Sequence, residues 1–186
     1  MPKFNVNAAT DNVALLVQLA GGRLHRVALL KVLYLAEREA LALYGSTITG
    51  ATFVSMQYGP VACEVYQLIK GERACARWAE YLASKGDDVV LLQDPSNDYT
   101  CRGHEQLVKK HWEAHRDGIV PGEHPTALVA YSHTLPEWRD PAGQGEVLIT
   151  QRQMLEAQGV SEDMIEDMER LDDEMMVFLQ LGEPAF

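Results

Sequence analysis

The chain has 186 residues, of which 47% are hydrophobic and 23% are charged. This is the composition of an ordinary globular protein, and the length suits one domain with its own hydrophobic core. No run of about 18 apolar residues is free of charge, which excludes a membrane-spanning helix at the level of sequence.

The net charge of −11 is distributed unevenly along the chain. Residues 1–116 hold 13 Lys and Arg against 12 Asp and Glu, whereas residues 117–186 hold 3 against 15. Because phosphate binding needs basic side chains, the acidic part argues against nucleic acid as its partner. It is compatible with a basic protein partner and, equally, with a solvated acidic surface that only promotes solubility.

The start of the chain, MPKFNVNAATDN, has no basic stretch followed by an apolar one, so we expect no secretory signal peptide. The three cysteines, Cys63, Cys75 and Cys101, are an odd number. Together these features predict a cytoplasmic protein with reduced thiols.

Two helices are predicted in the first quarter of the chain. Residues 13–20 carry apolar side chains at helical spacing. The run from Val27 to Tyr44 contains good helix formers without Pro or Gly, so it predicts a helix that is buried on most sides. Lys31 lies among the apolar residues of this run and needs a polar partner, for which Glu64 is the candidate.

A short extended run, Thr52–Gln57, follows the long helix. The next residues, Tyr58-Gly59-Pro60-Val61, separate this run from an apolar-periodic segment that Gly71 ends. Proline in a first helical turn has a preset φ and lacks an N–H that the helix would not use. The motif therefore predicts a turn into a helix over Val61–Lys70.

One β-hairpin is predicted in the middle of the chain. Asp88–Gln93 is rich in β-branched residues and leucine, and dense turn residues separate it from Tyr99–Cys101, the expected returning strand. A hairpin after several helices resembles a wing, which leaves a winged-helix element as an alternative. Further helices are predicted over 104–117, 126–133, 151–158 and, as an acidic C-terminal helix, within 160–182.

The acidic C-terminal helix has one apolar face, formed by Met164, Met168, Leu171, Met175 and Phe178 at helical spacing. Such a face most often belongs to a core. Methionine side chains also adapt to varied surfaces, so a partly open face with an acidic rim would suit a basic amphipathic partner. An apolar face can pair with itself as well, which leaves a homodimer as an alternative.

The sequence contains no recognised catalytic or cofactor-binding motif. Ser132 precedes His133, but no G-x-S-x-G element surrounds the serine, and no phosphate-binding glycine loop occurs. We therefore expect no catalytic residue, no cofactor and no enzymatic activity. The weak candidates for zinc ligands are Cys101, His104, His111 and His115, although a structural zinc site usually offers paired thiolates.

The stretch from Arg26 to Gly71 resembles the Panacea domain of SocA-like antitoxins, a family that includes GepA-type phage-associated proteins. The matching residues are Leu30, Lys31, Tyr34, Leu35, Tyr44, Gly45, Ile48, Thr49, Gly50, Met56, Tyr58, Gly59, Pro60, Val61, Glu64, Tyr66, Lys70 and Gly71. A second, weaker block resembles the family at Tyr131-Ser132-His133 and Trp138.

The predicted elements make one mainly α, compact domain over residues 1–186, with a single β-hairpin. The resemblance implies a Panacea antitoxin of a type II-like toxin–antitoxin system that neutralises a partner toxin protein by direct binding. The family also includes an adaptor that delivers its toxin to the ClpXP protease, so a ClpXP-type protease is a second implied partner. The alternative function is a winged-helix-like DNA-binding autoregulator, which needs a basic face built from Arg23, Arg26, Lys109, Lys110 and Arg116.

Two groups of residues are expected to serve this function. Those predicted to contact the partner are Tyr58, Gly59, Pro60, Tyr66, Met164, Met168, Met175 and Phe178, because exposed aromatic and methionine side chains anchor interfaces well. Those predicted to support the motif are Lys31, Tyr34, Gly50, Glu64, His133 and Trp138.

Overall fold

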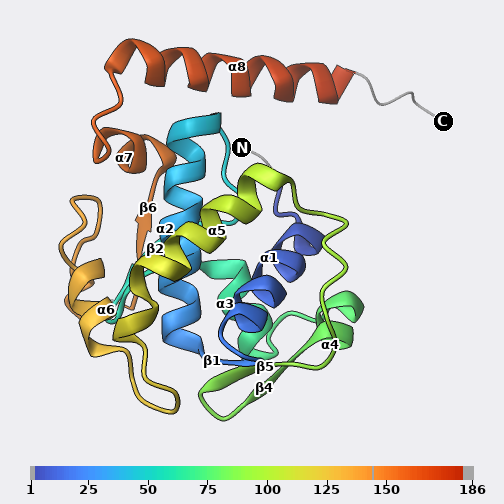
Figure 1. Cartoon of the computed structure of the whole chain (residues 1–186). Helices are drawn as coiled ribbons and strands as arrows, with labels where there is room; N and C mark the ends of the chain where they lie inside the picture. Colours follow the sequence, from blue (N-terminus) through green and yellow to red (C-terminus); the bar gives the residue numbers. More distant parts are fainter. Residues whose placement is uncertain (1–2, 144, 182–186) are drawn as a thin grey trace.

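The computed structural model describes residues 3–143 and 145–181, with the backbone alone for residues 175, 176 and 178–181. Helix α2 (Arg26–Tyr44) lies at the centre of the molecule (Figure 1). The other elements are α1 (Val6–Leu19), β1 (Arg23–His25), β2 (Phe53–Met56), β3 (Gly59–Ala62), α3 (Cys63–Lys70), α4 (Ala76–Tyr81), β4 (Leu82–Lys85), β5 (Asp88–Leu91), α5 (Arg102–His115), the 3-10 turn η1 (Arg116–Gly118), α6 (Thr126–Ser132), β6 (Val147–Ile149), α7 (Gln151–Glu156) and α8 (Glu162–Leu181). None of the described helices is long and apolar enough to cross a membrane.

Helix α2 is buried on most of its surface, as its sequence predicts. His25 precedes it, and the His25 Nδ1 atom accepts a hydrogen bond from the backbone N–H of Val27. Gly45 ends the helix in the left-handed conformation, with φ of 71°. Helices α1, α3, α5, α6 and α7 and strands β1 and β3 all pack against it. The helix therefore contacts five other helices and, through β1 and β3, both sheets.

The strands form two three-stranded antiparallel sheets. One sheet has the order β1-β5-β4, in which Val89 of β5 lies opposite Leu24 of β1. The other has the order β3-β2-β6, in which Val54 of β2 lies opposite Val61 of β3 and Leu148 of β6. The protein is a mixed α/β structure, so the prediction of a mainly α fold with one β-hairpin is wrong.

The predicted hairpin has a different partner in the structure. Strand β5 pairs with β4, which precedes it, through a tight turn at Gly86, whose φ is 64°. Tyr99 lies in a turn, and Thr100 and Cys101 are irregular, so this segment does not form a strand. The four residues of β4 follow directly after α4, without a loop between the helix and the strand.

The Tyr58-Gly59-Pro60 motif also differs from its predicted role. Gly59–Ala62 is strand β3, and the helix begins only at Cys63. Pro60 lies opposite Ser55 on an edge strand, where a residue without an N–H is tolerated. The motif therefore forms the turn and return strand of a β-hairpin and does not open the helix.

Several buried polar side chains of α2 hold distant segments in place. Glu37 is fully buried and accepts hydrogen bonds from the backbone N–H of Ile48 at 2.5 Å and from both the N–H and the hydroxyl of Thr49. Burial raises the pKa of Glu37 to about 7, and these hydrogen bonds act in the opposite direction. This carboxyl group thus fixes the loop that leads from α2 to β2.

A second group of interactions joins α2 to the segment after α6. The Tyr34 hydroxyl donates to Glu137 Oε1 at 3.0 Å, and Arg38 pairs with the same carboxylate at 2.5 Å. Glu137 is buried, so this charge is compensated within the protein. The two parts of the sequence that resemble the Panacea family are therefore joined through α2.

Helix α8 crosses over one end of the molecule, at the C-terminal end of α2 (Figure 1). Its anchor is Ile165, which is fully buried, and Met168 packs beside it against the core. Met164 and Leu171 remain 52% and 59% exposed. The predicted apolar face of this helix is thus only partly covered. Met175 and Phe178, the other two predicted contact residues of α8, have side chains outside the part that the structure describes.

We predict that Glu37→Ala lowers the free energy of unfolding by about 3 kcal/mol or more, because two N–H groups and a hydroxyl lose their buried acceptor. Glu37→Gln, which keeps one acceptor oxygen, should cost less than half as much. The measurement is urea unfolding at neutral pH, with the half-buried Glu39→Ala as the control. Equal losses for Glu37→Ala and Glu39→Ala would contradict this role.

Candidate functional site

Residues of the Arg26–Gly71 stretch surround a cavity of about 460 Å³, here called the Tyr58 pocket. It lies where the N-terminal end of α2 meets the β2–β3 turn and helix α3. Its walls include His25, Val27, Leu30, Lys31, Met56, Tyr58, Val61, Tyr66 and His124. Aliphatic and aromatic side chains with a few polar groups are typical of a binding pocket.

The tight packing of Gly59 explains why the motif has a glycine at this position. Gly59 has φ of 98°, and a Cβ atom there would overlap Ser132 Oγ and lie 3.0 Å from Lys31 Cε. The next residue, Pro60, accepts a hydrogen bond on its carbonyl from Lys31 Nζ at 2.7 Å. Gly59 and Pro60 are both buried, so their predicted contact with a partner is indirect: they place Tyr58.

Lys31 is only 1% exposed, and burial lowers the pKa of its ammonium to about 7. Glu64, the partner expected from the sequence, lies elsewhere. It accepts hydrogen bonds from the N–H of Thr52 at 2.8 Å and from the Thr52 hydroxyl at 3.0 Å. Glu64 therefore holds the start of β2, while Lys31 holds the return strand of the same hairpin.

Tyr58 is 51% exposed and belongs to a row of three rings. Its ring centroid lies 5.0 Å from that of His124, which lies 5.6 Å from that of His25, both in edge-to-face arrangements. Burial lowers the pKa of His25. Tyr66, on α3, is half-buried and lines the same pocket. The rings give Tyr58 a defined position on the surface.

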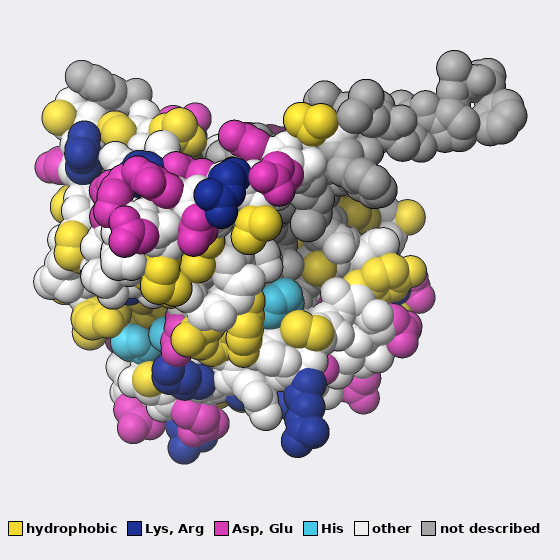
Figure 2. Space-filling model, turned by 90° about the horizontal axis from the view of Figure 1, so that it is seen from above, with side chains coloured by type: hydrophobic (Ala, Val, Ile, Leu, Met, Phe, Trp, Pro, Cys, Tyr) yellow, Lys and Arg dark blue, Asp and Glu magenta, His cyan; other side chains and the backbone are white. Residues whose placement is uncertain are grey.

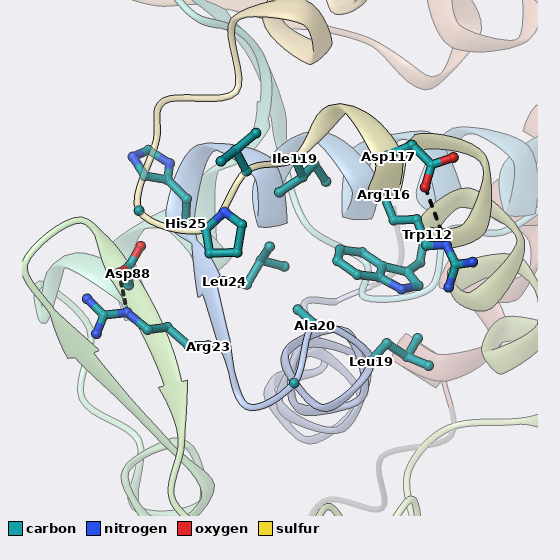
Figure 3. Close-up of a pocket in the computed structure, with 14 residues that line it drawn as sticks. Leu19, Ala20, Arg23, Leu24, His25, Asp88, Trp112, Arg116, Asp117 and Ile119 are labelled. Atoms are coloured by element: carbon teal, nitrogen blue, oxygen red, sulfur yellow. Dashed lines mark hydrogen bonds and ion pairs between the residues drawn. The ribbon is translucent and has the colours of Figure 1, made fainter.

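A second cavity, of about 760 Å³ (Figure 3), shares His25 with the lining of the Tyr58 pocket. The side chains of Leu19, Trp112 and Ile119 point into it. At its rim, Arg23 pairs with Asp88, and Arg116 lies 3.8 Å from Asp117. Since both guanidinium groups already face a carboxylate, the cavity suits an apolar side chain better than a phosphate.

The second sequence block supports the Tyr58 hairpin. The His133 ring stacks on Trp138 with centroids 4.0 Å apart, and Trp138 Nε1 donates to the carbonyl of Met56 at 3.2 Å. The Ser132 hydroxyl donates to the Val129 carbonyl at 2.8 Å. These contacts account for Ser132, His133 and Trp138 by packing and hydrogen bonding, whereas Tyr131 is 46% exposed.

Gly50, another predicted motif residue, lies in the loop held by Glu37. It has φ of 66°, and its N–H donates to the Thr47 hydroxyl at 3.2 Å. A residue with a side chain adopts this backbone conformation at a cost, which explains the glycine.

The weak zinc candidates do not converge on one point. Cys101 is exposed, and the His104 ring lies 6.0 Å from that of Tyr44. His111 Nε2 lies 2.7 Å from Glu39 Oε2, and its ring stacks on His115 at 6.5 Å. Within the described residues, no group of three or more His, Cys, Asp or Glu side chains is placed to hold a metal ion.

The five residues expected to build a basic face each lie beside a carboxylate. The pairs are Arg23–Asp88, Arg26–Asp87 at 2.6 Å, Lys109–Glu105 at 3.4 Å, Lys110–Glu39 at 2.5 Å and Arg116–Glu113 at 3.2 Å. A DNA phosphate would have to compete with each of these partners, which argues against the DNA-binding alternative.

The predicted contact residues fall into two separate places. Tyr58 and Tyr66 lie at the N-terminal end of α2, whereas Met168 lies near Gly45 at the other end. A helix of this length, 19 residues, spans about 28 Å. Sequence reasoning did not find His25 and His124, because isolated histidines outside a periodic pattern carry no signal of their spatial neighbours.

A family model described as Antitoxin SocA-like, Panacea domain, matches residues 29–139 of the chain. This chain belongs to the SocA-like Panacea antitoxin family. The matched segment begins in α2 and includes the Tyr58 hairpin and Trp138, so it contains both blocks that α2 joins. Membership of an antitoxin family indicates an antitoxin role in general, and with it a toxin as partner in general. No curated protein and no solved structure matched the chain.

We predict a distinct pH dependence of stability from Lys31 of this Panacea domain. Its pKa is about 7 in the folded protein against an ordinary 10.5, so between these values the unfolded chain binds more protons. The contribution of Lys31 to the free energy of unfolding should therefore rise with pH, by about 1 kcal/mol per pH unit between about pH 7.5 and 9.5. In urea unfolding at a series of pH values, the free energy of unfolding of the wild type should rise by this amount relative to that of Lys31→Met. The free energy of unfolding of the exposed control Lys109→Met should change with pH as that of the wild type does.

We also predict that Gly59→Ala destabilises the domain by about 2 kcal/mol or more. The added methyl group would overlap the Ser132 hydroxyl, and the left-handed backbone conformation at position 59 is unfavourable for alanine. Removing the hydroxyl in the double variant Gly59→Ala/Ser132→Ala should recover part of this loss. Thermal and urea unfolding of the single and double variants measure the coupling. Simple additivity of the two substitutions would rule out the proposed contact.

Proposed function

We propose that this protein is the antitoxin of a toxin–antitoxin pair and that it neutralises a toxin protein by binding it directly, without catalysis. The observation that carries the proposal is the match of the Panacea antitoxin family to residues 29–139. In this proposal the toxin is the protein encoded by a neighbouring reading frame.

The Tyr58 pocket supports this proposal as the main contact surface. Tyr58 is half-exposed, yet the buried Gly59 and the neighbouring His124 fix its position. A tyrosine held in this way loses little conformational entropy on binding and offers both apolar area and a hydroxyl. The cavity of the Tyr58 pocket can accept a side chain of the toxin next to the Tyr58 ring.

The first test is co-expression with the neighbouring reading frame. We expect this frame alone to arrest growth, and co-expression of the Panacea protein to restore growth and to yield a complex in a pull-down. A harmless neighbour that does not co-purify would contradict the proposal.

Tyr58→Ala tests the surface. We expect it to weaken toxin binding by about 2 kcal/mol, or about thirtyfold in Kd, because an anchoring tyrosine loses its contact area. Tyr99→Ala is the matched control, since Tyr99 is 48% exposed but lies in the loop before α5, outside the lining of the Tyr58 pocket. Titration of the purified proteins measures both constants, and equal affinities would place the interface elsewhere.

The amount of toxin in the cell separates the two modes of neutralisation. In direct neutralisation the toxin accumulates in the complex while growth recovers. In an adaptor mode the toxin disappears, and it persists in cells that lack ClpXP. Immunoblots of both strains during rescue distinguish these outcomes.

A further inference from the structure

Helix α8 is attached to the rest of the protein along one side. Ile165 is fully buried, and Met168 lies half-buried beside it. Arg152 of α7 reaches two carboxylates of α8, Glu162 at 2.5 Å and Glu169 at 2.6 Å. These contacts hold the first half of the helix in one orientation and leave a second side of it open.

The open side carries an apolar stripe. Met164 and Leu171 are more than half exposed, and their spacing of seven residues places them on nearly the same side of the helix, about 20° apart. Met175 and Phe178 continue the same spacing in the sequence. The stripe is rotated by roughly a quarter turn from the side that Ile165 anchors, so it is not part of the core.

The surroundings of the stripe are acidic. From Glu162 to Glu174, eight residues are Asp or Glu, and Arg170 is the one basic residue. Asp167, which pairs with Arg170 at 2.8 Å, and Glu174 lie one step around the helix from Leu171, along the solvent edge of the stripe. Figure 2, which looks down on α8, shows Asp and Glu side chains gathered over this end of the molecule with hydrophobic side chains among them.

This combination defines the chemistry of what can cover the stripe. A second copy of the chain would bring the same carboxylates to face these, and a nucleic acid would bring phosphates, so both are repelled. A helix with Leu or Met on one side and Lys or Arg at the edges would bury the stripe and neutralise its rim.

We infer that the Met164–Leu171 side of α8 is a second docking surface, which binds a basic amphipathic helix of the toxin. This inference rests on the proposed function, in which a toxin binds this antitoxin. It adds a contact at the opposite end of α2 from the Tyr58 pocket, so the toxin is held at two separated places.

The test compares three double variants of the full chain in binding to the toxin purified from the co-expressed complex. Met164→Ser/Leu171→Ser removes the stripe and should weaken binding about tenfold or more. Asp167→Asn/Glu174→Gln removes two charges at its edge and should weaken binding about fivefold at low salt, and less at high salt. Glu166→Gln/Asp173→Asn removes two charges from the other side of the helix and should change binding less than twofold. The altered residues are exposed, so thermal unfolding should remain unchanged.

Two further measurements make failure of this inference distinct from failure of the proposed function. If the toxin binds the wild type and all three variants equally, the α8 inference is overturned while the antitoxin proposal stands. If no neighbouring protein binds at all, a synthetic Lys/Leu amphipathic helix is titrated instead, with a Glu/Leu helix as its control. Selective binding of the basic peptide that is lost in the Met164→Ser/Leu171→Ser variant supports the surface, and no binding overturns it.

Sedimentation that shows a dimer of the wild type and a monomer of the Met164→Ser/Leu171→Ser variant would also overturn the inference, since a second copy of the chain would then cover the stripe.

Discussion

The burial of α2 is the constraint on which the rest of the structure depends. A helix surrounded by other elements can carry polar side chains only if each of them finds a partner, because an unpaired buried polar group costs several kcal/mol. The partners in this protein come from three distant segments: Pro60 for Lys31, Thr49 for Glu37, and Glu137 for Tyr34 and Arg38. The hydrogen bonds and ion pairs of the polar side chains of α2 thus fix the positions of the β2–β3 hairpin, of the loop before it and of the segment around Glu137.

This arrangement gives a physical meaning to the pattern of the Panacea family in this chain. Most of the motif residues do not face solvent; they bond to or pack against α2 and each other. Gly59 leaves room for Ser132, and Trp138 donates to the hairpin that Gly59 turns. Tyr58 is one of the exposed aromatic residues that this framework presents, together with Tyr44 and Tyr131. A framework built in this way can keep its internal contacts while the exposed surface changes to suit different partners.

The sequence predicted the parts of the fold that depend on local periodicity. The long buried helix and the helices predicted over 104–117, 126–133 and 151–158 all follow from patterns within one segment. Long-range pairing was not predictable in this way: β5 combines with both β1 and β4, and neither partner leaves a mark in the sequence of β5. Because its residues come from distant segments, only part of the candidate site could be predicted from the sequence. Tyr58 stands out in its motif, whereas His124 joins it only through the fold.

The strand order of sheet β3-β2-β6 also limits where this chain can be truncated without loss of a paired strand. The segment that matches the family ends at residue 139, before the strand that pairs with β2, and begins inside α2, after the whole of α1. A fragment cut at these limits would leave one sheet without an outer strand and would remove α1, which packs against α2, α4 and α5. The segment that matches the family is therefore shorter than the set of elements that pack together in the structure. Fusion proteins and chimeras made from this domain should keep α1 and β6 on either side of it.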